Sequence, residues 1–201
     1  RNDIDIHSKT ASEIFNVPLE YVDSEMRRKA KAVNFGIVYG ISDYGLSQSI
    51  HSTRNDAKIF IEKYFETYPK VKEYLEKSIE FAKTNGYVKT LFNRRRMIDE
   101  LNSNNYNLKQ FGERVALNMP LQGTASDIIK LAMINVEEEF YKLNLKSKLI
   151  LQIHDELIVD CDKNEVDLVK QILKDKMENV VKLNIPLIVN VSVGDNLYDA
   201  K

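Results

Sequence analysis

The sequence predicts an α+β fold, with a mostly helical first half followed by a small antiparallel sheet that long helices back. Apolar residues recur at helical spacing through most of residues 6–85 and again through 108–143. The spacing changes to the alternation of strands at residues 86–99 and 148–161. The chain contains no internal repeat and no low-complexity tract, so neither a solenoid nor a disordered tail is expected.

The composition is that of an ordinary globular protein, with 43% hydrophobic and 29% charged residues. No apolar run approaches the ~18 residues of a membrane span, and the polar residues 1–10 do not form a signal peptide. Because the chain lacks a first Met, we expect a fragment or a processed product. Cys161 is the only cysteine, which excludes a disulfide within the chain and favours a reducing compartment. The net charge of −1 argues against binding nucleic acid through bulk positive charge.

The first half of the chain is divided into helices by its capping residues. Asp23 or Ser24 can cap a helix that Gly40 ends. Thr53 opens a capping-box pattern for another helix, and Gly86 closes the last one before the first strands. These signals predict helices over residues 6–15, 25–39, 54–67 and 71–85.

The second half begins with a predicted hairpin and a polar loop. The loop at residues 102–107 is a candidate boundary, which divides the chain into subdomains 1–105 and 106–201. A helix from about Leu108 is expected to break or kink at Pro120 and to continue to about Leu143 from a new cap at residues 124–127. The remaining predicted elements are strands at 87–91, 95–98, 148–153, 156–161 and 186–193, and a helix at 163–183.

The stretch LQIHDELIVD, residues 151–160, places three titratable side chains at the join of two apolar strands. His154, Asp155 and Glu156 fall where two or three residues must form a tight hairpin, so their side chains can converge. Adjacent carboxylates repel, and in a buried site a cation or strong hydrogen-bond donors must compensate them. Mg²⁺ is commonly held by one or two carboxylates and substrate phosphates. A solvent-exposed acidic turn explains the same three residues and is the more common case for an isolated motif.

A stripe on the helix at 25–39 changes from cationic to aromatic. Arg27, Lys31, Phe35 and Tyr39 are spaced by four and share one helical face. A nucleoside triphosphate has an anionic end and a stackable end, and would use both halves of this face. Gly36 costs about 1 kcal/mol relative to Ala in a helix, which suggests that something packs closely against the backbone there. An amphipathic helix with snorkelling basic ends remains the alternative.

A second polar row falls four residues apart at Arg114, Asn118 and Gln122. Long donors in such a row can contact the acceptors of a minor groove or a sugar-phosphate edge. Polar helix faces often look the same, so the row is weak evidence alone. His7, a lone histidine in a short helix, is weaker still.

Taken together, these motifs resemble family A DNA polymerases. RRKAKAVNFGIVYG at residues 27–40 is similar to the nucleotide-binding motif of the fingers in this family, and LQIHDELIVD is similar to its later palm motif. The other family-like segments, in the order of the family, are DIHSKTA at 5–11, TLFNRRR at 90–96 and ERVALNMPLQGTASDIIKLAM at 113–133. The resemblance extends from about Asp5 to Tyr198. It implies that residues 1–105 form a fingers subdomain and residues 106–201 the C-terminal part of a palm subdomain.

The resemblance also implies a role for each site residue. The triphosphate of a dNTP would be held by His7, Arg27 and Lys31, of which Lys31 also counts as catalytic. Phe35 would pack against the sugar and base, and a Phe there implies poorer acceptance of dideoxynucleotides. The nascent base pair would lie beside Tyr39. Primer-template DNA would be contacted by Arg114, Asn118, Gln122 and His154.

The implied chemistry is in-line attack of a primer 3′-hydroxyl on the α-phosphate, assisted by two Mg²⁺ ions. Asp155 would be a catalytic metal ligand, with Glu156 in a supporting catalytic role. The resemblance further implies a monomeric, cytoplasmic enzyme of the bacterial nucleoid, with no membrane association. The family also uses an aspartate from an earlier palm strand and a thumb, which these residues do not include. We therefore expect the 201-residue chain not to polymerise alone.

Two other functions fit parts of the pattern. A non-catalytic module that binds nucleotide or nucleic acid would use the helical stripe without the acidic hairpin. A metal-dependent phosphohydrolase would use the hairpin, but it should show further ligands, and the other histidines, His7 and His51, have no metal-ligand spacing to His154.

Overall fold

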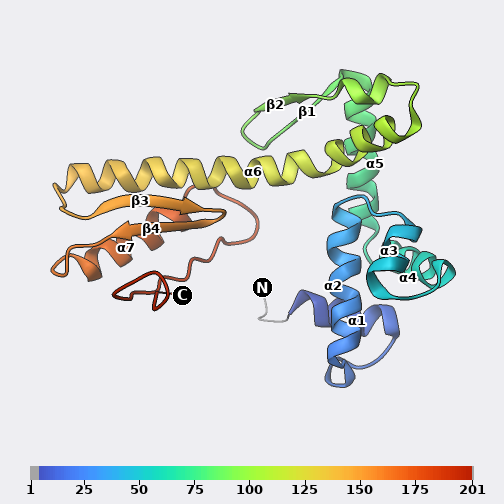
Figure 1. Cartoon of the computed structure of the whole chain (residues 1–201), viewed down its shortest axis with the longest axis horizontal. Helices are drawn as coiled ribbons and strands as arrows, with labels where there is room; N and C mark the ends of the chain where they lie inside the picture. Colours follow the sequence, from blue (N-terminus) through green and yellow to red (C-terminus); the bar gives the residue numbers. More distant parts are fainter. Residues whose placement is uncertain (1–4, 201) are drawn as a thin grey trace. The chain divides into compact units, whose positions relative to one another are not determined.

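The computed structural model describes residues 5–200, which form two compact units (Figure 1). The first unit is Arg1–Gly123 and the second is Thr124–Lys201. The described chain is mainly helical and contains two small antiparallel sheets, so the predicted α+β class is confirmed. Within residues 5–200, no helix is both long enough and apolar enough to cross a membrane.

The first unit contains most of the helices and the smaller hairpin. Its elements are α1 Ile6–Phe15, η1 Leu19–Tyr21, α2 Ser24–Val38, α3 Asp43–Ile50, α4 Arg54–Thr67, α5 Pro69–Asn85, β1 Tyr87–Lys89, β2 Arg95–Met97 and η2 Asp99–Asn102, and it includes the first half of α6 Tyr106–Lys142. All four helices predicted in the first half are present, within two residues of the predicted bounds.

The capping residues act as the sequence indicated. The Asp23 side chain accepts a hydrogen bond from the Met26 N–H, and the Thr53 side chain accepts one from the Asp56 N–H. Gly86 ends α5 in the left-handed conformation, with φ of 73°. Helix α3 was not predicted. Its N-terminal cap is Ser42, and its eight residues carry too few apolar positions to be distinguished from a loop by periodicity.

The buried faces of these helices form the main core of the first unit. On α2 the buried residues are Ala30, Val33, Gly36 and Ile37, which are spaced by three or four. They pack with residues of α1, α3, α4, α5 and α6, namely Ile14, Leu46, Ile50, Ala57, Tyr64, Leu75 and Leu117. The opposite face of α2 is therefore left for other contacts.

Helix α6 is continuous through Pro120, so the predicted break there is wrong, and the kink that was its alternative stays a prediction. Residues 124–127 lie inside the helix and do not cap a new one. A proline costs a helix one hydrogen bond, about 3 kcal/mol, and packing on both sides can exceed that cost. Here Met119, next to the proline, is buried in a second core of the first unit, and Ile129 is buried further along the helix. The division between the two compact units falls within α6, after Gly123. The functional boundary expected near residue 105 stays a prediction.

The second unit joins the end of α6 to one hairpin and one helix, β3 Lys148–Ile153, β4 Glu156–Asp160 and α7 Val166–Glu178. Its core contains Val136 and Phe140 of α6 and Val169, Ile172 and Leu173 of α7. Strands β3 and β4 match the prediction within one residue and pair antiparallel, with Ile153 opposite Glu156.

Two predictions for the last residues are wrong. The helix predicted at 163–183 is shorter at both ends, and Asn179 caps it by bonding the Asp175 carbonyl. The strand predicted at 186–193 is not formed in the described structure. There Ile188 is 75% exposed, and the Val189 N–H is bound by the Glu178 carboxylate instead of a neighbouring strand. Apolar alternation alone does not supply the partner strand that a ladder requires.

Candidate functional site

The predicted stripe on α2 lies on the exposed face of that helix. Phe35 and Tyr39 are 49% and 42% exposed, although they belong to a helix with a well-buried opposite face. Lys31 is also exposed and makes no ion pair or side-chain hydrogen bond within residues 5–200. A surface with an unpaired cation beside two exposed aromatic rings can bind an anion that is joined to a flat ring.

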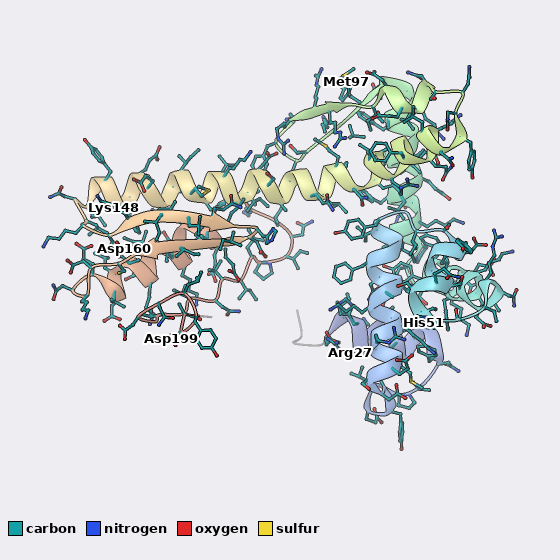
Figure 2. All side chains as sticks on the ribbon, viewed as in Figure 1. Arg27, His51, Met97, Lys148, Asp160 and Asp199 are labelled. Carbon is teal, nitrogen blue, oxygen red and sulfur yellow. The ribbon has the colours of Figure 1, made fainter. Side chains whose placement is uncertain are left out.

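Arg27, which is labelled in Figure 2, lies at the cationic end of the stripe on α2. Its Nε and one terminal nitrogen donate to the two Asp5 oxygens at 2.9 and 3.1 Å. Asp5 also caps α1 by accepting from the Ser8 N–H at 2.8 Å. The Arg27 guanidinium and then Ser8 lower the pKa of Asp5 well below its usual range. The two hydrogen bonds to Asp5 hold the Arg27 guanidinium beside the start of α1, where the side chain remains 46% exposed.

The structure brings His7 against the same stripe. The rings of His7 and Phe35 are 5.5 Å apart between centroids, at an angle of 45°. On its other side, His7 Nδ1 lies 3.0 Å from Nδ2 of Asn34. The packing of α1 along α2 therefore places His7 against Phe35 of the stripe, two residues after the Asp5 that holds Arg27.

The close packing expected at Gly36 comes from the chain itself. A Cβ on Gly36 would lie 2.7 Å from Ile41 Cγ2. The Ile41 N–H donates to the Gly36 carbonyl at 2.8 Å, and the Gly40 N–H donates to the Ile37 carbonyl at 3.0 Å. These two bonds form a Schellman motif, which requires the left-handed φ of 66° at Gly40. The motif fixes the direction in which the chain leaves Tyr39.

The end of α2 also meets α6, within the first unit. A Cβ on Gly40 would lie 3.1 Å from Leu117 Cδ1 and 3.4 Å from Arg114 Cγ. A cavity of about 270 Å³ opens beside this contact, with apolar walls that include Ile37, Ile41 and Leu117 and with Arg114 at its edge. Arg114 is therefore near the aromatic end of the stripe. It makes no ion pair in the part of the chain that the structure describes.

The other two residues of the polar row differ in exposure. Gln122 is exposed, whereas the Oδ1 atom of Asn118 is buried without a hydrogen-bond partner among the described residues. A buried acceptor without a donor is costly. It is satisfied if a donor from a bound molecule or a water reaches it.

The segment TLFNRRR forms the β1–β2 turn and is held against α6. Thr90 is buried and its Oγ1 accepts from the backbone N–H groups of Phe92 and Arg94, both at 3.2 Å. Arg94 donates to the Gly123 carbonyl at 3.0 Å. A Cβ on Gly123 would lie 2.7 Å from Thr90 Cγ2, so glycine is required for this contact.

The acidic motif lies in the turn between β3 and β4. His154 has a left-handed φ of 52°, and its carbonyl accepts a short hydrogen bond from the Gln152 amide. The side chains of His154, Asp155 and Glu156 are exposed and have no hydrogen bond or ion pair within residues 5–200. In the same residues no three His, Cys, Asp or Glu side chains gather as a metal site. The turn offers two carboxylates, the kind of ligand that suits Mg²⁺, but it does not form a complete cage by itself.

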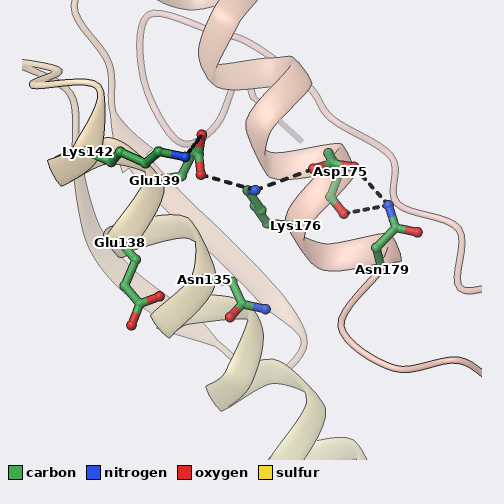
Figure 3. Close-up of a pocket in the computed structure, with 7 residues that line it drawn as sticks. All are labelled: Asn135, Glu138, Glu139, Lys142, Asp175, Lys176 and Asn179. Carbon is green, nitrogen blue, oxygen red and sulfur yellow. Dashed lines mark hydrogen bonds and ion pairs between the residues drawn. The ribbon is translucent and has the colours of Figure 1, made fainter.

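A charged groove in the second unit was not anticipated from the sequence (Figure 3). It lies between the end of α6 and α7, has a volume of about 420 Å³, and is lined by Asn135, Glu138, Glu139, Lys142, Asp175, Lys176 and Asn179. Lys176 Nζ lies 3.2 Å from Glu139 and 3.6 Å from Asp175, so its ammonium is shared by two carboxylates. None of the residues that line the groove belongs to the β3–β4 turn. The groove is therefore a salt-bridged contact between two helices and does not include the acidic motif.

Comparison with protein families and relatives gives one consistent result. The chain matches the family model described as DNA polymerase family A over residues 1–199. It is 55% identical over 201 residues to DNA polymerase I of Caldicellulosiruptor bescii, covering 100% of the chain and 24% of that protein. It is 50% identical over 200 residues to DNA polymerase I of Bacillus subtilis, covering 100% of the chain and 23% of that protein.

A solved structure shows the same likeness in three dimensions. The POL domain of Pol1 from M. smegmatis, in complex with a DNA primer-template and a dNTP, matches 98% of the chain at a TM-score of 0.92 and 40% identity. The match covers 35% of that domain. The chain thus spans about a quarter of its curated relatives and about a third of this structural neighbour.

Proposed function

Because the chain belongs to DNA polymerase family A, we propose that it forms the dNTP-binding and part of the catalytic region of a DNA-directed DNA polymerase. The reaction is template-dependent addition of dNTPs to a primer 3′-hydroxyl, in DNA replication or repair. The observation that carries this proposal is the exposed stripe on α2, with Lys31 and Arg27 at one end and Phe35 and Tyr39 at the other. The named ligands of the M. smegmatis domain, primer-template DNA and a dNTP, support the same substrates here.

In this proposal the first unit binds the incoming nucleotide. The triphosphate is held by His7, Arg27 and Lys31. Arg27 reaches it by giving up or sharing the two hydrogen bonds that it donates to Asp5. Phe35 packs on the sugar and base of the nucleotide. Its ring is half exposed beside His7, so one side of the ring is open for this contact. Tyr39 lies by the nascent pair at a position that the Schellman motif after α2 fixes. These residues belong to a fingers subdomain, residues 1–105.

We assign primer-template DNA to the polar row of α6 and to the hairpin. Arg114 and Gln122 offer exposed donors, and Asn118 offers a buried acceptor without a partner in the described chain. His154 is exposed at the β3–β4 turn. These residues belong to the C-terminal part of a palm subdomain, residues 106–201.

Family membership implies the use of a divalent metal, and we propose Mg²⁺, with two ions in the reaction. Asp155 is the ligand, and Glu156 supports it from the next position. Both are exposed carboxylates without a partner in residues 5–200, as a shared metal site requires. When bound there, the metal would supply activation of the 3′-hydroxyl and stabilisation of negative charge at the phosphates. We place the enzyme in the bacterial cytoplasm at the nucleoid, as a monomer.

A chimaera tests the proposal directly. The 201 residues replace the matching segment of the Bacillus subtilis relative, and Mg²⁺-dependent primer extension is measured. Lys31→Ala and Asp155→Ala are each expected to reduce extension by at least about a hundredfold, the scale seen when charge stabilisation at a reacting centre is removed. The matched controls are Lys29→Ala, which removes a cation that pairs with Glu25 on α2, and Asp160→Ala, at the far end of β4. Both controls are expected to extend normally.

Two results would overturn the assignment. Extension by Asp155→Ala at the level of its control would remove the hairpin from the catalytic site. A folded chimaera that binds dNTP or DNA but never extends a primer would favour the non-catalytic binding module.

A further inference from the structure

The side chain of Asn34 lies beside the stripe but does not belong to it. Asn34 precedes Phe35 on α2 and turns toward α1, where its Nδ2 lies 3.0 Å from His7 Nδ1 and 3.2 Å from Thr10 Oγ1. Neither Asn34 nor Thr10 is among the residues assigned above to nucleotide, DNA or metal. An amide nitrogen has two hydrogens, so it can donate to both neighbours at once.

Thr10 is the second neighbour of the Asn34 amide. Thr10 is fully buried and its hydroxyl donates to the Ile6 carbonyl at 2.8 Å, so Oγ1 is left as an acceptor. Both amide atoms of Asn34, Oδ1 and Nδ2, lie 3.2 Å from this Oγ1, so Thr10 favours neither orientation of the amide. The orientation is given by His7, because the amide atom that lies 3.0 Å from His7 Nδ1 is the nitrogen, which can only donate.

This orientation fixes the proton on the imidazole. A neutral histidine has one nitrogen that donates and one that accepts. Because His7 Nδ1 accepts from Asn34, the proton must be on Nε2. The Phe35 ring lies beside the imidazole, 5.5 Å away between centroids and tilted by 45°.

We propose that Asn34 is a positioning residue, which holds neutral His7 as the Nε2–H tautomer so that this N–H faces the triphosphate site. The inference rests on the proposed nucleotide site. It adds that the donor at position 7 is set by a side chain on α2. If Asn34 served only to tie α1 to α2, any residue that kept the helices packed would replace it, and the tautomer would not depend on it.

The first test uses the wild-type 201-residue chain without nucleotide. In a ¹⁵N-labelled sample at about pH 8, where histidine is neutral, His7 is assigned by the signals that His7→Gln removes. We expect the Nε2–H pattern, together with a scalar coupling across the N–H···N bond between Asn34 Nδ2 and His7 Nδ1. An Nδ1–H pattern would overturn the proposal, because the amide would then present its oxygen.

The second test reverses the hydrogen bond. In Asn34→Asp the carboxylate can only accept, so His7 is expected to carry a proton on Nδ1. Asn55→Asp adds the same charge at an exposed position of α4 and is the matched control, in which the wild-type tautomer is expected. If Asn34→Asp keeps the wild-type ¹⁵N pattern, Asn34 does not set the tautomer.

Titration with a dNTP and Mg²⁺ separates this inference from the proposed function. Asn34→Asp is expected to weaken dNTP binding about tenfold or more, the scale of one hydrogen bond to a charged group, whereas Asn55→Asp is not. If the tautomer switches in Asn34→Asp but dNTP leaves the His7 signals unchanged, the positioning role stands and the proposed nucleotide site fails at His7. If dNTP shifts the His7 signals but His7 has the same tautomer in the wild type and in Asn34→Asp, the nucleotide site stands and the positioning role is refuted.

Discussion

Gly36→Ala is expected to destabilise the protein, although alanine is the better helix former. The added Cβ would lie 2.7 Å from Ile41 Cγ2 and 3.3 Å from Ile41 Cβ. Real Cβ contacts are almost never that short, and Cγ2 is fixed to a branched Cβ that cannot swing away. Ile41 would have to move, and with it the N–H that bonds the Gly36 carbonyl at 2.8 Å.

The magnitude follows from two opposing terms. Replacing glycine by alanine inside a helix contributes up to about 1 kcal/mol of stability. Overpacking a well-packed site costs roughly 1–3 kcal/mol. The net change in the free energy of unfolding should therefore be a loss of up to about 2 kcal/mol. The same displacement would loosen the Schellman motif that fixes the chain after Tyr39.

A double-mutant cycle separates the two terms. Ile41→Ala removes Cγ2, so Gly36→Ala in that background should cost nothing or stabilise by up to about 1 kcal/mol. The free energies come from urea unfolding of the wild type, the two single variants and the double variant. Each single variant serves as the control for the other.

One result would refute this reasoning. If Gly36→Ala stabilises the wild-type chain as much as it stabilises Ile41→Ala, the coupling energy is zero and Ile41 does not limit position 36. The glycine would then have to be explained by something that is bound to α2 and not by the chain itself.

Three further outcomes are expected. Gly123→Ala should lower stability by up to about 2 kcal/mol in urea unfolding, because the overlap of its Cβ with Thr90 outweighs the gain in helix propensity within α6; an unchanged midpoint would contradict this. Pro120→Ala should raise stability by up to about 3 kcal/mol, since α6 regains a hydrogen bond, and a loss would show that the proline is required by its surroundings. Hydrogen bonds from the Ser147 hydroxyl and nearby backbone N–H groups lower the pKa of Glu165. The Glu165 carboxylate therefore contributes to the free energy of unfolding above its ordinary pKa of 4.5, and this contribution is lost as pH falls through the lowered pKa of the folded state. In acid titrations followed by circular dichroism, Glu165→Gln should therefore flatten the loss of stability that the wild type shows below that value.

The helices and hairpins were predictable where the signal is local. Caps at Asp23 and Thr53, and glycines at positions 40 and 86, act on neighbours within four residues, and each ended or began an element as expected. The failures at Pro120 and at residues 186–193 have one cause. In both cases packing or pairing with distant residues decides the structure, and periodicity carries no information about those partners.

The same distinction applies to the site. The stripe on α2 was visible because its members are four residues apart, and the acidic turn because its members are consecutive. His7 and Asn34 are joined across 27 positions, and Arg114 meets Gly40 across many more, so the sequence could not show that these residues lie together. What the structure adds is the reason why the stripe can function. One face of α2 is buried by the core, Arg27 is held by Asp5, and Ile41 locks the end of the helix, so the exposed face is rigid before any ligand arrives.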